Sequence, residues 1–147
     1  MKRKINFTML IVFFISLFVI LGTGRKVPAK NGCSNASLRG SYGLHATGTT
    51  PGGPIALVGV ISYDGAGSLT GTVFARRTGS TTTEVIDLTG GTYTVHSDCT
   101  VSDTFGNGQH TSAIVDDGRG YFILNTTEGA PVVISGEARK QFPGNSE

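Results

Sequence analysis

From Gly40 onwards, apolar and polar residues alternate with a period close to two, and turn-forming residues interrupt the alternation at short, regular intervals. This pattern is typical of β-strands that bury one face, because successive side chains of a strand point to opposite sides of a sheet. Two interruptions, 64–67 and 117–120, have the sequence Asp-Gly-X-Gly. Glycine supplies the positive φ of a tight turn and aspartate bonds back to the turn amides, so we expect a hairpin at each place.

The alternation predicts nine short strands, whereas segment 49–54, with its two prolines and two glycines, is predicted to be a loop. The predicted strands are 41–47, 54–63, 68–77, 84–88, 92–96, 100–105, 109–115, 120–125 and 131–139. A meander of eight or nine strands removes its exposed edges by closing or by splitting into two sheets. We therefore predict an all-β fold, a closed antiparallel meander barrel of about eight strands, with a two-sheet sandwich as the alternative.

The beginning of the chain has the pattern of a secretory leader. Three basic residues at 2–4 precede an apolar run at 9–21, and Val27-Pro28-Ala29 supplies the small residues that an export peptidase requires. The apolar run is shorter than the roughly 20 residues that a membrane-spanning helix needs. We predict a cleaved signal peptide at 1–29, one β-barrel domain at 30–140, a flexible polar tail at 141–147, and a secreted or periplasmic location.

Removal of this leader would change the charge of the protein. The whole chain has a net charge of +2, but five of its twelve lysines and arginines lie in the leader. The remaining seven basic residues face ten acidic ones, which gives a net charge of −3. Nucleic-acid binding requires clustered positive charge and is therefore disfavoured, and no membrane span is expected after the leader is removed.

The two cysteines, Cys33 and Cys99, would be exposed to an oxidising compartment after export. We expect a disulfide between them that ties the start of the domain to its middle, rather than a reactive thiol. The three histidines, His45, His96 and His110, are scattered without ligand spacing and are expected to be strand or turn residues. No metal and no cofactor is predicted.

Three of the predicted strands are apolar on both faces, although a barrel wall that faces water should alternate. The pattern suggests that the N-terminal arm, a sister subunit or a second sheet covers this wall, and we expect a homo-oligomer. The doubly apolar segments are 54–63, 121–124 and 132–134.

Several motifs together resemble a group of small exported bacterial proteins. They are Cys33 followed by Leu-Arg-Gly-Ser-Tyr-Gly at 38–43, Tyr-Asp-Gly-Ala-Gly-Ser-Leu-Thr-Gly-Thr at 63–72, Gly-Thr-Tyr-Thr-Val at 91–95 before Asp-Cys-Thr at 98–100, and Ser-Gly-Glu-Ala-Arg-Lys-Gln at 135–141. The likeness spans nearly the whole of the chain after the leader. It implies a fold similar to the allene oxide cyclase-like barrel, an eight-stranded closed sheet, but it implies no activity and no catalytic residue.

Three classes of function are compatible with these features. The first is a secreted module whose barrel holds a small apolar molecule, and the second is an enzyme of the cyclase or isomerase type, which needs little more than a shaped cavity and one or two polar groups. The third is a structural or adhesive protein of the cell envelope. The sequence assigns no catalytic residue, and the expected pocket-lining residues are Tyr42, Val73, Tyr93, Phe105, Glu137 and Arg139.

Glu137 and Arg139 allow two interpretations, because residues two apart in a strand share a face. Inside the barrel they would form a buried charge pair. Outside it they would form a surface pair worth less than about 1 kcal/mol. We favour the surface position.

Overall fold

The computed structural model describes residues 32–106 and 108–142, so the predicted leader and most of the predicted tail lie outside the described residues. The described part contains nine β-strands, two short 3₁₀ turns and no α-helix. The elements are η2 (Asn35–Ser37), β1 (Arg39–Thr50), β2 (Gly53–Asp64), β3 (Ser68–Arg77), β4 (Glu84–Asp87), β5 (Gly91–Val95), β6 (Thr100–Phe105), β7 (Gly108–Val115), η3 (Asp116–Gly118), β8 (Gly120–Asn125) and β9 (Val133–Lys140).

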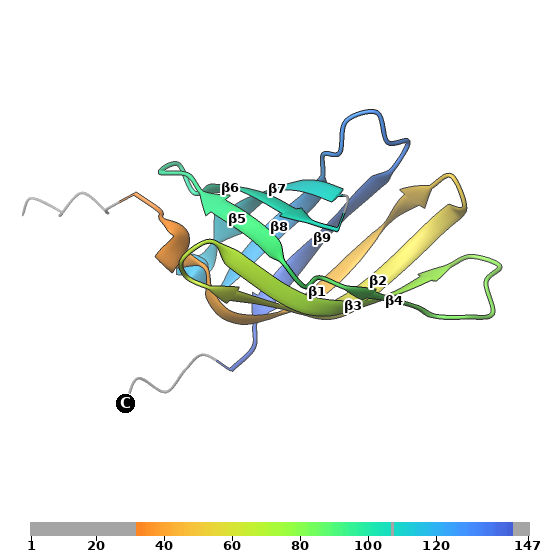
Figure 1. Cartoon of the computed structure of the whole chain (residues 1–147), viewed down its shortest axis with the longest axis horizontal. Coiled ribbons are helices and arrows are strands. Elements are labelled where there is room, and N and C mark those ends of the chain that lie inside the picture. Colours follow the sequence, from red (N-terminus) through yellow and green to blue (C-terminus); the bar gives the residue numbers. More distant parts are fainter. Residues whose placement is uncertain (1–31, 107, 143–147) are drawn as a thin grey trace, which may run out of the picture. The chain divides into compact units, whose positions relative to one another are not determined.

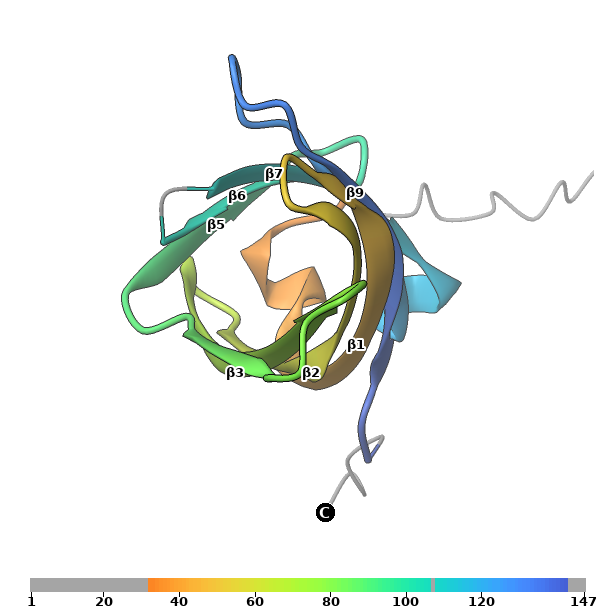
Figure 2. The same cartoon turned by 90° about the vertical axis from the view of Figure 1, so that its right-hand side faces the viewer.

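The strands form a closed antiparallel barrel (Figures 1 and 2). Strands that follow each other along the chain pair with each other, except β4 and β5, and β9 returns to pair with β1. Strands β4 and β5 both pair with β3, at 72–75 and 68–69, so they act as the two halves of one interrupted strand. The predicted meander barrel of about eight strands is therefore confirmed, and the alternative two-sheet sandwich is not formed.

The hairpin between β1 and β2 is longer than expected. Thr49 pairs with Pro54 and Thr50 with Gly53, so the loop predicted at 49–54 is wrong except for its two central residues. The ladder continues because Gly53 adopts a φ of +99° and Pro54 lies at the start of its strand, where a missing N–H group is tolerated.

The first Asp-Gly-X-Gly turn has the expected geometry. Asp64 Oδ1 accepts hydrogen bonds from the backbone N–H groups of Ala66, Gly67 and Ser68, at 2.7, 2.9 and 3.0 Å. These bonds lower the pKa of Asp64 to about 2, because they favour the charged carboxylate.

The second turn differs from this pattern. It is the 3₁₀ turn η3, in which both Asp116 and Asp117 adopt positive φ and the Arg119 N–H donates to the Asp116 carbonyl. Gly118 has the positive φ expected of it, and the two aspartates adopt it as well, because aspartate tolerates this left-handed conformation better than most residues. The expected hairpin between β7 and β8 is formed.

A disulfide between Cys33 and Cys99 confirms the predicted pairing and anchors the N-terminal arm to the turn after β5. Cys33 N–H also donates to the Ser97 carbonyl at 3.3 Å, and Asn35 Oδ1 accepts from Val95 N–H at 2.7 Å. These contacts hold η2 across one end of the barrel, which is visible when the barrel is viewed along its length (Figure 2).

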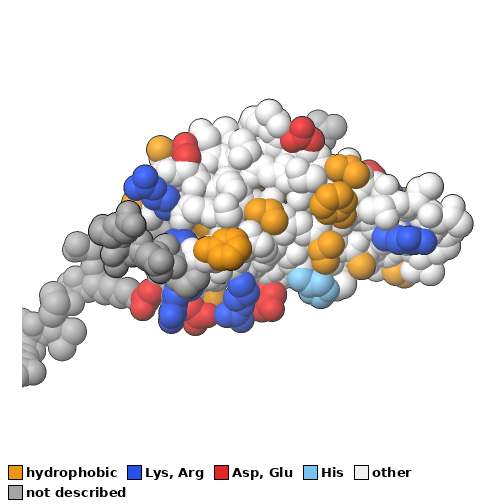
Figure 3. Space-filling view, turned by 90° about the horizontal axis from the view of Figure 1, so that it is seen from below, with side chains coloured by type: hydrophobic (Ala, Val, Ile, Leu, Met, Phe, Trp, Pro, Cys, Tyr) orange, Lys and Arg blue, Asp and Glu red, His pale blue; other side chains and the backbone are white. Residues whose placement is uncertain are grey.

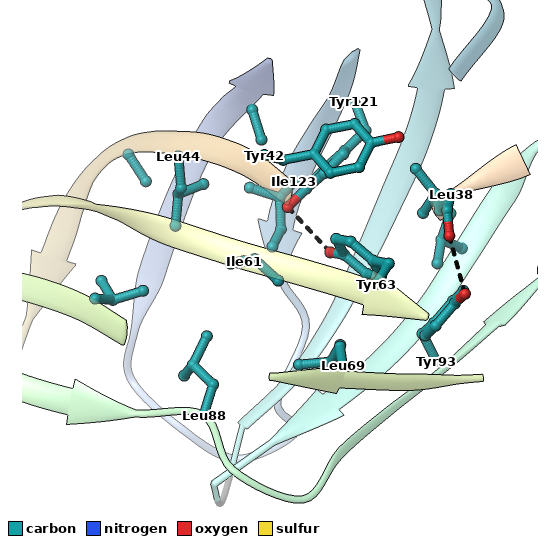
Figure 4. Packing of buried hydrophobic residues seen from close by; sticks show 14 of the residues in the cluster. Leu38, Tyr42, Leu44, Ile61, Tyr63, Leu69, Leu88, Tyr93, Tyr121 and Ile123 are labelled. Carbon is teal, nitrogen blue, oxygen red and sulfur yellow. Dashed lines mark hydrogen bonds between the residues drawn. The ribbon is translucent and has the colours of Figure 1, made fainter. Parts of the chain in front are cut away.

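All four tyrosines of the chain are buried and pack together toward that closed end (Figure 4). The rings of Tyr42 and Tyr63 meet edge to face, as do those of Tyr63 and Tyr93, and Tyr121 packs against both Tyr42 and Tyr63. Each hydroxyl has a partner: Tyr63 donates to Tyr121 at 3.0 Å, Tyr42 to the Gly118 carbonyl and Tyr93 to the Leu38 carbonyl. This half of the interior is therefore filled by side chains.

The outer wall carries exposed apolar side chains (Figure 3). Val58 lies opposite Phe74 in the β2–β3 ladder, and Phe74 lies opposite Val85 in the β3–β4 ladder. These three side chains are 53%, 46% and 63% exposed. Phe122 and Leu124 of β8 are exposed too, so the doubly apolar character predicted for β2 and β8 leaves apolar residues on the surface of the single chain.

Candidate functional site

A small apolar cavity, called the cup below, occupies the end of the barrel opposite the tyrosines. Its volume is about 70 Å³. Apolar residues from six strands and the segment after β4 form most of its wall, and Phe105, His110 and Asn125 complete it. The apolar residues are Leu44, Ala46, Leu57, Val73, Ile86, Leu88, Ile123 and Ile134.

The polar residues in and beside the cup follow from the register of neighbouring strands. Asp103 lies directly opposite His110 in the β6–β7 ladder, and His110 lies opposite Asn125 in the β7–β8 ladder. Residues opposite each other in an antiparallel pair share a face, so all three side chains point into the barrel. They form one row across three strands.

The central contact of this row joins a carboxylate to an imidazole. Asp103 Oδ1 lies 3.1 Å from His110 Nδ1, and the two side chains are 0% and 11% exposed. The two atoms are close enough for an ion pair but are not aligned for a hydrogen bond, and neither has a hydrogen-bond partner in the described part of the chain. A buried carboxylate is costly unless it is paired, so these two groups depend on each other.

The imidazole of His110 is held on its other sides as well. Phe105 stacks on the ring with centroids 4.0 Å apart and an interplanar angle of 12°. Asn125 Nδ2 lies 3.3 Å from His110 Nε2, and Thr127 Oγ1 accepts from the same amide at 3.3 Å. The ring plane and the direction of each nitrogen are therefore set by neighbouring residues.

Asp103 also connects the cup to the tyrosine cluster. Ser112 Oγ donates to Asp103 Oδ2 at 3.4 Å. Burial raises the pKa of Tyr63 well above 10.0, and the neighbouring Tyr121 and the Asp103 charge raise it further. Burial is also the main cause of the raised pKa of Tyr121, to which Asp103 again adds. In the sheet, Asp103 lies opposite Tyr93 of the filled half on one side and opposite His110 of the cup on the other.

The residues proposed from sequence as pocket lining occupy three different places. Val73 and Phe105 line the cup, while Tyr42 and Tyr93 belong to the filled half of the barrel. Glu137 and Arg139 lie on the outer wall.

The two outer residues interact with each other and with one further acid. Arg139 is 59% exposed, and its guanidinium lies 3.3 Å from Glu137 and 2.8 Å from Asp116. The surface position favoured for Glu137 and Arg139 is the one that the structure shows.

Asp103 belongs to no motif that marks it in the sequence, and His110 was expected only to be a strand or turn residue. A signal was nevertheless present, because Asp103 is in phase with the inward-facing Val101 and Phe105 of its strand. A carboxylate on the buried face of an alternating strand needs a partner. The partner, however, could be identified only once the register between β6 and β7 was known.

The described residues contain no group of three or more histidine, cysteine, aspartate or glutamate side chains placed to hold a metal ion. Within the same part of the chain, no helix is both long enough and apolar enough to cross a membrane. Comparison with known proteins finds no family model, curated protein or solved structure that matches this chain. The site must therefore be interpreted from its own geometry.

Proposed function

We propose that this protein is a secreted or periplasmic β-barrel that binds a small apolar molecule carrying one hydrogen-bonding group. The observation that supports this proposal is the cup itself, an apolar cavity into which, among the described residues, only His110 and Asn125 bring polar side-chain atoms. Binding sites for small molecules commonly combine apolar walls with a few convergent polar groups.

The size of the cup limits the ligand. Its 70 Å³ is far below the roughly 300 Å³ at the lower end of pockets for drug-sized molecules. The ligand is therefore a molecule of a few non-hydrogen atoms, or a longer one of which only the end enters the barrel.

Export is part of the proposal. The leader pattern at 1–29 supports it, and the Cys33–Cys99 disulfide is compatible with an oxidising compartment outside the cytosol. We also propose that the fold is similar to allene oxide cyclase-like barrels, which the closed sheet of eight strand positions supports. It assigns no residue a role.

Methyl-resolved NMR tests binding in the cup. Cyclopentanone, a small ring with one carbonyl group, is titrated into protein labelled at its valine, leucine and isoleucine methyl groups. We expect the resonances of Leu57, Val73 and Ile123 to shift, because these side chains line the cup. The exposed Val58 and Val133 of the outer wall serve as internal controls and should not move. Equal shifts in both sets, or none in the cup, would contradict the proposal.

A further inference from the structure

We propose that His110 Nε2 is a general base that removes a proton from the carbon beside the carbonyl group of a molecule bound in the cup. The proposed activity is the enolisation of a small ketone or aldehyde. This inference rests on the proposed binding function and adds to it the chemical class of the bound molecule. The juxtaposition that carries it is an imidazole with a buried carboxylate beside one nitrogen and the Asn125 amide beside the other, in the wall of an apolar cavity.

The position of Asp103 determines which nitrogen of the imidazole is available. A carboxylate beside Nδ1 favours the tautomer in which Nδ1 carries the proton, and Asp103 Oδ1 lies 3.1 Å from that atom. The lone pair then resides on Nε2, which faces the Asn125 amide group at 3.3 Å. His110 is thus the catalytic residue, and Asp103 is a positioning residue.

The surroundings also favour the charges that form during the reaction. When Nε2 takes up a proton, the ring becomes an imidazolium ion beside the fully buried Asp103 carboxylate. The apolar walls lower the local dielectric constant, and electrostatic interactions are stronger in such a medium than in water. The paired carboxylate therefore stabilises the protonated base.

Asn125 supplies the hydrogen-bond donor for the developing oxyanion. Its Nδ2 group donates to the Nε2 atom and to Thr127 Oγ1, each over 3.3 Å, which is longer than the usual range of hydrogen bonds. A ligand oxygen can replace the long contact with the imidazole. Because this donor and the base are neighbours, a carbonyl oxygen and the hydrogen on its adjacent carbon can engage both at once.

The reaction balances without a further reactant. The C–H bond breaks and an N–H bond forms at His110 Nε2. The former C–H pair becomes the carbon–carbon double bond, and the π pair of the carbonyl group moves onto its oxygen. Return of a proton from Nε2 to the same carbon regenerates the substrate. Return to a different, conjugated carbon gives an isomer.

Gly108 keeps the reactive edge of the imidazole free of side chains. A Cβ atom at this position would lie 2.9 Å from His110 Cε1 and 3.3 Å from Nε2. A Gly108→Ala substitution would therefore crowd the base without removing it, and it provides a probe of access to Nε2.

Deuterium exchange into cyclopentanone tests the activity. The unmodified protein in D2O should accelerate loss of the hydrogens beside the carbonyl, measured by proton NMR above a buffer blank. General-base catalysis typically contributes at least about 100-fold, so His110→Gln should lower the accelerated rate by that factor or to the blank. Gly108→Ala should lower it as well. The exposed His45 lies outside the barrel, so His45→Gln is the matched control and should keep the full rate.

A second measurement uses the unmodified protein and does not depend on a variant that folds. In ¹⁵N-histidine-labelled protein, the His110 shifts should show the proton on Nδ1 and an unprotonated Nε2, and Asp103→Asn should move this tautomer balance. A proton on Nε2 in the neutral ring would overturn the proposal.

The outcomes separate this inference from the binding function. If cyclopentanone shifts the methyl resonances of the cup but its hydrogens exchange no faster than in buffer, the base is refuted and the binding function stands. Failure of the ketone to bind would refute both.

Discussion

Gly59 lies where strands β2 and β3 approach each other too closely for an inward side chain. A Cβ atom there would lie 2.4 Å from the Thr72 carbonyl oxygen and 2.7 Å from Val73 Cα, both parts of the backbone. We expect Gly59→Ala to lower the free energy of unfolding by about 1–3 kcal/mol, because the strands must move apart. Urea denaturation followed by circular dichroism measures the change.

Gly43→Ala is the matched control for this substitution. Its nearest contacts would be atoms of the Gln141 side chain at 3.3 Å or more, and that side chain can move. The unfolding free energy should stay the same or rise by up to about 1 kcal/mol. Equal losses in the two variants would show that the close approach at Gly59 is not the cause.

The Asp64 carboxylate gives the protein a defined response to acid. Its pKa falls from 3.8 to about 2 on folding, because three backbone N–H groups bond the charged form. Its stabilising contribution is therefore complete above about pH 4 and is lost as the pH falls toward 2. In urea titrations at stepped pH, Asp64→Asn should lose less stability than the unmodified protein across this interval. Parallel curves would contradict this expectation.

At the scale of single elements, the disulfide fixes the N-terminal arm and η2 to the barrel. It joins residues 66 positions apart, for which the chain-entropy description gives a stabilisation of about 4 kcal/mol. The double substitution Cys33→Ser and Cys99→Ser should lower the unfolding free energy by roughly that amount, measured by urea denaturation. The unmodified protein with added reductant is the control and should match the variant. A variant as stable as the oxidised protein would contradict the role of the bridge.

The strands were largely predictable because their local pattern and their final environment agree. The bounds of β3, β6 and β8 are those that the alternation predicts. The full length of the β1–β2 hairpin was not predicted. Gly53 and Pro54 reduce strand propensity locally, but the pairing with β1 accommodates them.

The candidate site was less predictable than the strands. Val73 and Phe105 fit the simple rule that inward-facing residues line a barrel. The pairing of Asp103 with His110 depends on the register between two strands, and a shift of one residue would turn one of them outward. The local sequence of β6 and β7 does not contain that information.

At the scale of the whole molecule, the tyrosine cluster makes the barrel sensitive to alkali. Burial raises the pKa of all four tyrosines above the ordinary 10.0. The folded protein therefore holds these protons more tightly than the unfolded chain does. Their contribution to stability is complete below about pH 10 and is lost as the pH rises further, because the unfolded chain ionises first.

We therefore expect phenolate absorbance to appear together with the loss of circular dichroism during alkaline titration. Tyr121→Phe removes one of these groups and should make the loss of stability above pH 10 less steep. Phenolate absorbance that develops fully while the sheet remains intact would contradict this account.

Self-association is expected from the outer wall. Val58, Phe74 and Val85 form a continuous exposed row, and within the described residues β4 pairs with β3 alone. Exposed apolar residues beside an unpaired strand edge favour contact with another chain, and we expect a second copy to cover them.

Val85→Lys should shift the mass measured by light scattering toward the monomer, because a charge in this row would have to be desolvated on association. Val133→Lys, at an equally exposed valine outside the row, should leave the mass unchanged. A monomeric mass for the unmodified protein at micromolar concentration would refute the association and leave the row open to solvent.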